Sequence, residues 1–151
     1  LALGVAEINL EELTGAYASY VNTSKPVKPY AITKIEDKDG RVIATFKPKI
    51  VEEKAYSDYT RQVMLHMMQA TVNSGTASRL RTSYQLTNAI AGKTGTAELK
   101  ASKDGEADVL GWFDCFTTDS NENQLLIISM VENGRSLGGS HYLIKKIKTL
   151  F

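Results

Sequence analysis

Cysteine is nearly absent from this chain of 151 residues, which has only Cys115. A single cysteine excludes an internal disulfide and says little about the redox compartment. An excess of one charge is also missing, since 18 basic and 17 acidic residues leave a net charge of +1. Such an even balance gives no electrostatic reason to expect binding to nucleic acid or to an anionic surface.

Long apolar runs are lacking as well. No stretch approaches the ~20 apolar residues that span a bilayer, and the start does not resemble a signal peptide. We therefore expect no direct membrane contact by this segment. Hydrophobic residues make up 42% of the chain and charged residues 23%, which is ordinary for a globular domain able to bury a core. The chain starts at Leu1 without a methionine, so we expect it to be a piece of a longer protein.

Three segments have the spacing of amphipathic helices. Asn9 and Glu12 have the positions of a capping box and predict a helix over residues 10–21. A second helix is predicted over residues 57–73, with Val63, Met64, Met67, Met68 and Val72 as its apolar stripe and Gly75 after its end. Ser140 is a candidate N-cap for a last helix that packs through Leu143, Ile147, Leu150 and Phe151.

The strands are predicted from alternation and from apolar runs. Residues 32–46 alternate around Asp39-Gly40, which is typical of a hairpin. In the second half, residues 110–116 and 125–131 are apolar on both faces, and residues 119–121 join them as a turn would. Together with a strand near residue 93, this order predicts an α/β (α+β) fold in which helices flank an antiparallel sheet.

The most informative stretch is residues 92–98, Gly-Lys-Thr-Gly-Thr-Ala-Glu. Its threonines and small residues favour an extended backbone. On a strand, Thr94 and Thr96 project to one face while Lys93 and Gly95 face the other way. Glycine there allows close approach by another chain. Such a strand can bind an anion with its side chains and pair its main chain with an extended peptide.

Three interpretations of this stretch compete. A phosphate-binding loop would need a glycine five positions before Gly92, where Thr87 stands, and a helix beginning at Lys93. A Gly/Thr-rich strand with one solvated lysine is the plainest alternative. The third is the Lys-Thr-Gly element of the serine acyl-transferases among penicillin-binding proteins and β-lactamases, and the surrounding residues fit it best.

Several motifs in order along the chain resemble the C-terminal half of the transpeptidase domain of penicillin-binding proteins. They cover almost all of the sequence and are specific as a set, although each one alone is not. The motifs are Leu13-Thr14-Gly15-Ala16-Tyr17-Ala18 followed by Asn22, Asn73-Ser74-Gly75-Thr76-Ala77, residues 91–98, Gly111-Trp112-Phe113 and residues 126–133.

The resemblance implies a β-lactamase/transpeptidase-like fold and a substrate-binding site at Lys93, Thr94, Gly95 and Thr96. Lys93 and the two hydroxyls would bind the terminal carboxylate of a peptidoglycan stem peptide or of a β-lactam. The backbone N–H of Thr96 would be half of an oxyanion hole. The resemblance implies no cofactor and no metal, and it places the longer protein, anchored in the membrane, on the extracytoplasmic face of a bacterial cell membrane.

Two motifs of that family are absent. No serine has a lysine three positions later, so the Ser-x-x-Lys nucleophile motif is missing, and Ser-x-Asn is missing as well. Tyr20-Val21-Asn22 resembles a variant of the second motif, but it is better explained as the end of a helix. We therefore expect residues 1–151 to be the C-terminal part of a transpeptidase domain, inactive without the remainder. The alternative is a non-catalytic β-lactam or peptidoglycan sensor with the same fold.

Other candidate residues have simpler explanations. Cys115 lies in an apolar strand and is predicted to be a small buried hydrophobe. His66 has no acid or cysteine nearby at metal-ligand spacing. His141, at the start of the last helix, is interpreted as a surface or cap residue and not as a catalytic base. Of Trp112 and Phe113, one should point into the core and the other outward, where it could line a substrate groove.

Overall fold

The computed structural model describes residues 6–84, 89–99, 107–119 and 124–151. The chain divides into two compact units, which we call the hairpin unit (residues 8–61) and the sheet unit (residues 62–151 together with 1–7). Among the described helices, none combines the length and the apolar character needed to cross a bilayer.

The hairpin unit begins with helix α1, Leu10–Val21, at the predicted bounds. The predicted capping box is confirmed, because the Asn9 side chain accepts a hydrogen bond from the Glu12 backbone N–H at 2.8 Å. This bond satisfies one of the N–H groups that the first turn leaves without a helical partner. The helix packs closely on the following chain at Gly15, where an added Cβ would lie 2.3 Å from the Val27 carbonyl oxygen.

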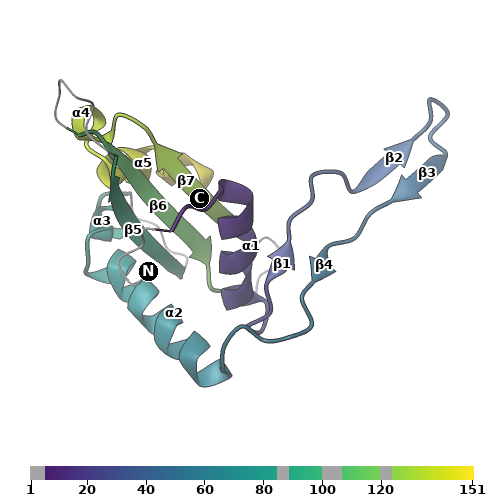
Figure 1. Ribbon diagram of the computed structural model, residues 1–151, viewed down its shortest axis with the longest axis horizontal. Helices are drawn as coiled ribbons and strands as arrows, with labels where there is room; N and C mark the ends of the chain where they lie inside the picture. The colour runs from purple at the N-terminus through teal and green to yellow at the C-terminus, as the bar shows by residue number, and fades with distance from the viewer. Residues whose placement is uncertain (1–5, 85–88, 100–106, 120–123) are drawn as a thin grey trace. The chain divides into compact units, whose positions relative to one another are not determined.

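After α1 the chain forms an extended two-stranded arm (Figure 1). At its base, β1 (Val27–Lys28) pairs antiparallel with β4 (Lys49–Ile50). Further out, β2 (Lys34–Glu36) pairs antiparallel with β3 (Val42–Thr45), which confirms the predicted hairpin. Gly40 turns the chain between them with φ of 81°, a conformation that glycine adopts at little cost.

The arm has an unusual pattern of burial. Antiparallel strands with alternating residues commonly bury one face, but the large apolar side chains of the arm are exposed. They include Ile32, Ile35, Val42, Ile43 and Phe46. The difference arises because no second layer of described residues covers either face of this two-stranded ribbon, and a lone ribbon has no core of its own.

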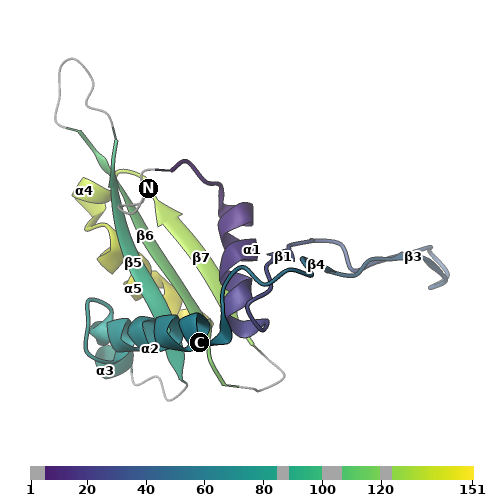
Figure 2. The same cartoon turned by 60° about the horizontal axis from the view of Figure 1, so that its bottom comes forward.

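The sheet unit is built on three strands that lie side by side (Figure 2). They are β5 (Ile90–Glu98), β6 (Val109–Thr117) and β7 (Leu126–Val131), in the order β5-β6-β7 and antiparallel throughout. The three predicted strands and their pairing are thereby confirmed. The predicted turn at residues 119–121 falls mostly outside the described residues.

Helices come before and after these strands in the chain. Helix α2 (Asp58–Asn73) and the short α3 (Ser78–Tyr84) precede β5. After β7 come α4 (Gly134–Leu137), α5 (Ser140–Ile147) and a 3₁₀ turn (Lys148–Leu150). The predicted antiparallel sheet with helices packed on it is therefore observed.

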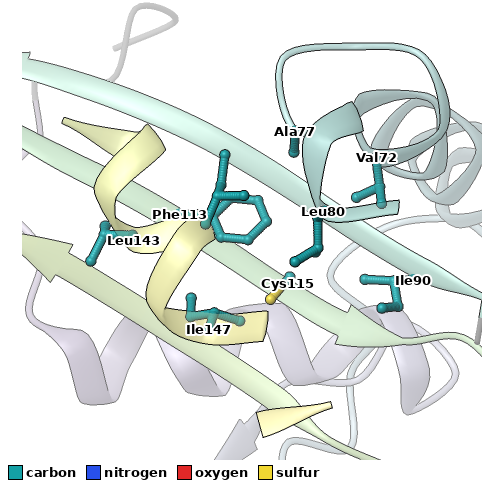
Figure 3. Close-up of a cluster of buried hydrophobic side chains, with 9 residues drawn as sticks. Val72, Ala77, Leu80, Ile90, Phe113, Cys115, Leu143 and Ile147 are labelled. Atoms are coloured by element: carbon teal, nitrogen blue, oxygen red, sulfur yellow. The ribbon is translucent and has the colours of Figure 1, made fainter. Parts of the chain in front are cut away.

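The core of the sheet unit lies between one face of the sheet and these helices (Figure 3). Strand β6 contributes Phe113 and Cys115, both fully buried, and β5 contributes Ile90. The helices contribute Val72, Ala77, Leu80, Leu143, Ile144 and Ile147. Phe113 and Cys115 share a face because alternate residues of a strand project to the same side.

Two predictions about the last helix are wrong. The N-cap of α5 is Gly139, with φ of 59° and no side-chain hydrogen bond, so Ser140 is the first helical residue and not the cap. Leu150 is exposed because the helix tightens into a 3₁₀ turn at Lys148, which breaks the 3.6-residue period. Ile144 takes a place in the core instead.

The apolar stripe of α2 is narrower than predicted. Met68 and Val72 are buried, but Val63 and Met67 are exposed. Consecutive helical residues point about 100° apart, and the buried side of α2 includes Met68 and Val72, which are four residues apart, but not Met67. Helices α3 and α4 were not predicted at all, since seven and four residues are too few to show a helical period.

Candidate functional site

Strand β5 contains all four predicted site residues, Lys93, Thr94, Gly95 and Thr96, in a nine-residue extended segment. Lys93 is therefore not at the start of a helix, and the phosphate-loop interpretation is wrong, because that loop needs a helix there. Thr87, where that motif would need its first glycine, lies outside the described residues.

The register with β6 fixes which face each side chain occupies. Thr94 is opposite Phe113 and Thr96 is opposite Gly111, so both hydroxyls lie on the face that carries the core. Lys93 is opposite Asp114 and projects to the other face. Because the ammonium and the hydroxyls lie on opposite faces, only a ligand at the strand's outer edge can reach all of them.

The outer edge of β5 is open among the described residues, because β5 pairs with β6 alone there. The backbone N–H of Leu99 donates to the Asp108 carbonyl and that of Thr118 donates to the Ala89 carbonyl, both at 2.9 Å. These bonds show that the odd-numbered residues of β5 direct their backbone groups toward β6.

The even-numbered residues consequently direct their backbone N–H and C=O groups away from β6. Thr94 and Thr96 therefore present main-chain donors and acceptors along the open edge, next to their hydroxyls. Thr94 is half-buried and Thr96 is exposed. An extended peptide could add to this edge as a further strand.

Lys93 is exposed, and its ammonium donates a hydrogen bond to the backbone carbonyl of Thr94. That carbonyl is one of the outward-facing groups. The side chain thus reaches from its own face to the open edge, and its positive charge lies where an anionic group beside the edge would be attracted.

Gly95 and Trp112 lie opposite each other in the ladder. A Cβ added to Gly95 would lie 3.2 Å from the Trp112 Cβ, so the tryptophan side chain rises directly beside the glycine. The two aromatic residues point to opposite faces, as predicted, and the structure shows which is which: Phe113 points into the core, and Trp112 lies half-buried on the face of Lys93. The glycine keeps the strand surface flat next to the indole.

Asp114 is a charged residue of this region that the sequence analysis did not single out. It is only 5% exposed and lies opposite Lys93. The signal that could have identified it is the strand register, which follows only once both strands and their turn are known. Its neighbour Cys115 is buried as predicted. Burial, and then the Asp114 charge, raise the pKa of the Cys115 thiol to about 12.

A cavity of about 500 Å³ lies near the start of β6 and includes none of the four predicted residues. Asp108, Asn133, Arg135, Ser136 and Leu137 line it. In the described parts of the chain, no group of three or more His, Cys, Asp or Glu side chains is placed to hold a metal ion.

Comparison with known sequences gives a consistent result. The family model of the penicillin binding protein transpeptidase domain matches residues 1–148. Penicillin-binding protein 3 of Bacillus subtilis is 30% identical over 149 residues, which are 98% of this chain and 20% of that protein. Penicillin-binding protein 1A of Aquifex aeolicus is 39% identical over 98 residues, 65% of this chain and 13% of that protein. The chain thus spans about a fifth or less of the length of these relatives.

Solved structures share the fold. Penicillin-binding protein 2B from Streptococcus pneumoniae superposes with a TM-score of 0.68 at 19% identity, covering 91% of this chain and 23% of that structure. Penicillin-binding protein A from M. tuberculosis, in an imipenem acyl-enzyme complex, also has a TM-score of 0.68, at 20% identity. That superposition covers 98% of this chain and 32% of the other. At such identities the likeness establishes the fold.

Proposed function

Because the chain belongs to the family of penicillin-binding protein transpeptidase domains, we propose that it forms the substrate-clamping wall of a serine D,D-transpeptidase that cross-links peptidoglycan. In this proposal residues 1–151 are the C-terminal part of the domain. The nucleophile comes from the rest of the domain, since no serine in this chain has a lysine three positions later.

The observation that carries the proposal is the open edge of β5. The outward backbone groups of Thr94 and Thr96 would pair with a stem peptide that ends in D-alanyl-D-alanine. Gly95 would let that peptide lie close to the strand. Main-chain pairing of this kind fixes the orientation of the peptide without depending on its side chains.

The charged end of the substrate would be held at the same edge. The Lys93 ammonium already reaches the carbonyl of Thr94 at the edge. From there it would bind the terminal carboxylate together with the Thr94 and Thr96 hydroxyls. Charge-assisted hydrogen bonds of this type are roughly twice as strong as neutral ones.

The reacting carbonyl would lie beside Thr96. Its backbone N–H points away from β6 and would donate to the oxygen that becomes negatively charged as the serine attacks. Loss of one such donor typically costs about 10²–10³-fold in rate. The acyl group would then pass to an amine of a neighbouring peptide, and a β-lactam would bind as a mimic that stays attached. The longer protein would act on the outer face of the cell membrane.

The test uses the longer protein that carries this chain, titrated with a fluorescent penicillin. Lys93→Met should lower the second-order rate of acylation by about 10- to 100-fold, as expected for the loss of a hydrogen-bonded charge. Lys145→Met, which removes an exposed lysine from α5, is the matched control and should leave the rate unchanged. Equal acylation rates for the Lys93 variant and the control would refute the proposed binding of the substrate carboxylate by Lys93.

The alternative function is a non-catalytic sensor of β-lactams or peptidoglycan, which the absence of a Ser-x-x-Lys motif from the rest of the longer protein would favour. The same titration separates the two. A sensor without a serine nucleophile would bind the penicillin reversibly and release it intact after denaturation, whereas a transpeptidase would retain the label.

A further inference from the structure

The cavity near the start of β6 lies apart from the residues proposed to hold the end of the substrate. It has a volume of about 500 Å³, and its lining comes from Asp108 and from the segment around α4. We propose that this cavity binds an amine-bearing side chain of the donor peptide, the one whose D-alanyl-D-alanine end is attacked, and that the Asp108 carboxylate binds the ammonium. The inference rests on the proposed function, because it concerns a further part of the same substrate.

Backbone hydrogen bonds hold the Asp108 carboxylate in place. Its Oδ1 atom accepts from the backbone N–H of Val109 at 2.8 Å and from that of Arg135 at 3.2 Å. The Arg135 side chain donates to the Ala107 carbonyl, from Nε at 3.0 Å and from Nη2 at 2.7 Å. The carboxylate is thus fixed between the start of β6 and α4, and a group that is already fixed loses little entropy when a ligand binds.

The lining suits an ammonium on an aliphatic stem. Both hydrogen bonds to the Asp108 carboxylate end at Oδ1, and Oδ2 has no partner within the described residues. The Asn133 side chain, which makes no capping hydrogen bond, adds an amide oxygen as a second acceptor. Leu137 is 45% exposed and gives an apolar wall along which methylene groups can pack.

The positive charge of Arg135 also borders the cavity and opposes the entry of a cation. Arg135 is exposed, however, so solvent and salt screen its charge. An ammonium in direct contact with the Asp108 carboxylate would make a charge-assisted hydrogen bond, which is about twice as strong as a neutral one. The direct contact therefore outweighs the screened repulsion.

The position of the cavity fits the course of the donor peptide. In the proposed complex the terminal carboxylate lies at Lys93 and the reacting carbonyl at Thr96, so the rest of the peptide continues toward the C-terminal end of β5. There the Leu99 N–H donates to the Asp108 carbonyl at 2.9 Å. Asp108 thus lies opposite a residue three positions beyond Thr96, about 10 Å along the strand.

This distance identifies which amine the cavity takes. An attacking amine must come within about 3–3.5 Å of the reacting carbonyl, and the cavity is too far from Thr96 for that. The donor peptide carries an amine as well, because it belongs to the same polymer as the peptide that attacks. From the residue just before D-alanyl-D-alanine, a flexible four-carbon stem can extend along the strand toward Asp108.

Competition with a fluorescent penicillin, in the longer protein, tests the inference. N-acetyl-lysyl-D-alanyl-D-alanine and its norleucyl analogue differ only in the terminal ammonium of one side chain. The lysyl peptide should slow labelling at an about tenfold lower concentration, as expected for a hydrogen bond to a charged group. Asp108→Asn should remove this preference, because the amide keeps an oxygen for the two backbone donors but has no charge.

The rate of labelling by the penicillin alone shows whether each variant is folded, and Asp108→Asn should leave that rate unchanged. Asn133→Gly is a second variant. It removes the amide and keeps a residue that tolerates the φ of 53° at this position, so the preference for the lysyl peptide should fall. Glu132→Gln is the matched control, since this exposed carboxylate is adjacent in sequence but does not line the cavity, and the preference should persist.

Equal competition by the two peptides in the unmodified protein would overturn the inference, as would a preference that survives Asp108→Asn. If that variant kept the preference but formed less cross-linked product with a free amine acceptor, the cavity would bind the acceptor and the inference would also be wrong. Failure of the proposed function gives another pattern. Neither peptide would then compete, and Lys93→Met would leave the labelling rate unchanged.

Discussion

Strand β6 illustrates how two neighbouring residues acquire different chemistry from their position. Asp114 and Cys115 are consecutive, yet the register directs one toward the face of Lys93 and the other into the core. Cys115 is fully buried, and this burial, more than the adjacent carboxylate, suppresses its ionisation. The thiol is therefore a small core residue and not a nucleophile.

We predict that Cys115 reacts slowly with Ellman's reagent in the native chain. A pKa of about 12 in place of 9.0 reduces the thiolate fraction at pH 8 about 1000-fold, and burial adds a steric barrier. The rate is measured by absorbance with and without urea. Fast labelling of the folded chain, at the rate seen in urea, would show that the thiol is accessible.

A second residue-scale prediction concerns Asp58, at the start of α2. A hydrogen bond from Lys54, at 2.7 Å, is the main cause that lowers the pKa of Asp58 below its ordinary 3.8, and Ser24 and Arg61 also contribute. A carboxyl whose pKa is lowered in the folded state stabilises that state at pH values above the ordinary pKa of the group. This contribution is lost as the pH falls below 3.8 and the group becomes protonated.

Asp58→Asn should therefore lower the urea midpoint of unfolding at pH 7, and the difference from the unmodified chain should shrink as the pH falls below about 3.8. Glu53→Gln, which removes an exposed carboxylate nearby, is the control for net charge. A difference that stays constant from pH 7 to pH 2 would mean that Asp58 acts through something other than its charge.

At this scale the sequence predicted the residues of a motif but not their neighbours. Lys93, Thr94 and Thr96 were placed on an extended strand, with the lysine on the face opposite the hydroxyls, and the structure agrees. Asp114 could not be placed beside Lys93, because the residues that join β5 to β6 leave the register undetermined until the pairing is known.

At the scale of elements, the contact between β6 and the start of α5 depends on the absence of a side chain. A Cβ added to Gly111 would lie 2.5 Å from the Gly139 carbonyl carbon and 2.9 Å from the Ser140 nitrogen. Both are backbone atoms, so the contact cannot be relieved by a change of rotamer. The helix must move away from the sheet instead.

Gly111→Ala should thus destabilise the chain by about 1–3 kcal/mol, the usual cost of overpacking, measured by urea unfolding. Ser140→Ala is a suitable control. Because Ser140 makes no capping hydrogen bond in the structure, loss of its hydroxyl should change the free energy of unfolding little. If Ser140 were the N-cap, the same substitution would cost ~1 kcal/mol. Equal effects of the two substitutions would contradict the close contact.

Elements with a strong local signal were predicted well. The bounds of α1 were correct because Asn9 and Glu12 form the capping box, and the hairpin formed where Asp39-Gly40 indicated it. The short α3 and α4 and the glycine cap of α5 were not predicted. Each depends on tertiary contacts, and local propensity carries little information about those.

At the scale of the whole molecule, the order of the motifs carried more information than any motif alone. Lys-Thr-Gly by itself left three interpretations open, yet the ordered set predicted the family that the match over residues 1–148 now establishes. Which large apolar residues of the arm are exposed could not be predicted in this way. Their burial depends on which other parts of a protein pack against the arm, and alternation within a strand does not reveal that.

The proposal assigns the nucleophile to the rest of the domain, and this gives a prediction for residues 1–151 alone. Residues 1–151 alone should form no covalent adduct with a fluorescent penicillin, because no serine in the chain belongs to a nucleophile motif. The assay is fluorescence of the band after denaturing electrophoresis, with the longer protein as the positive control. A labelled 151-residue band would show that one of these serines can act as a nucleophile without the missing motif.

The alternation along β5 has a consequence for how this strand can vary. Adding or deleting one residue between Gly92 and Thr96 would leave the sheet foldable. It would turn every side chain of the strand beyond the change to the opposite face of the sheet. The lysine or the threonines would exchange inward and outward orientations, and the main-chain groups at the edge would turn toward β6. Natural variation in length should therefore be confined to the connections outside this strand, while changes of residue type within it remain compatible with the fold.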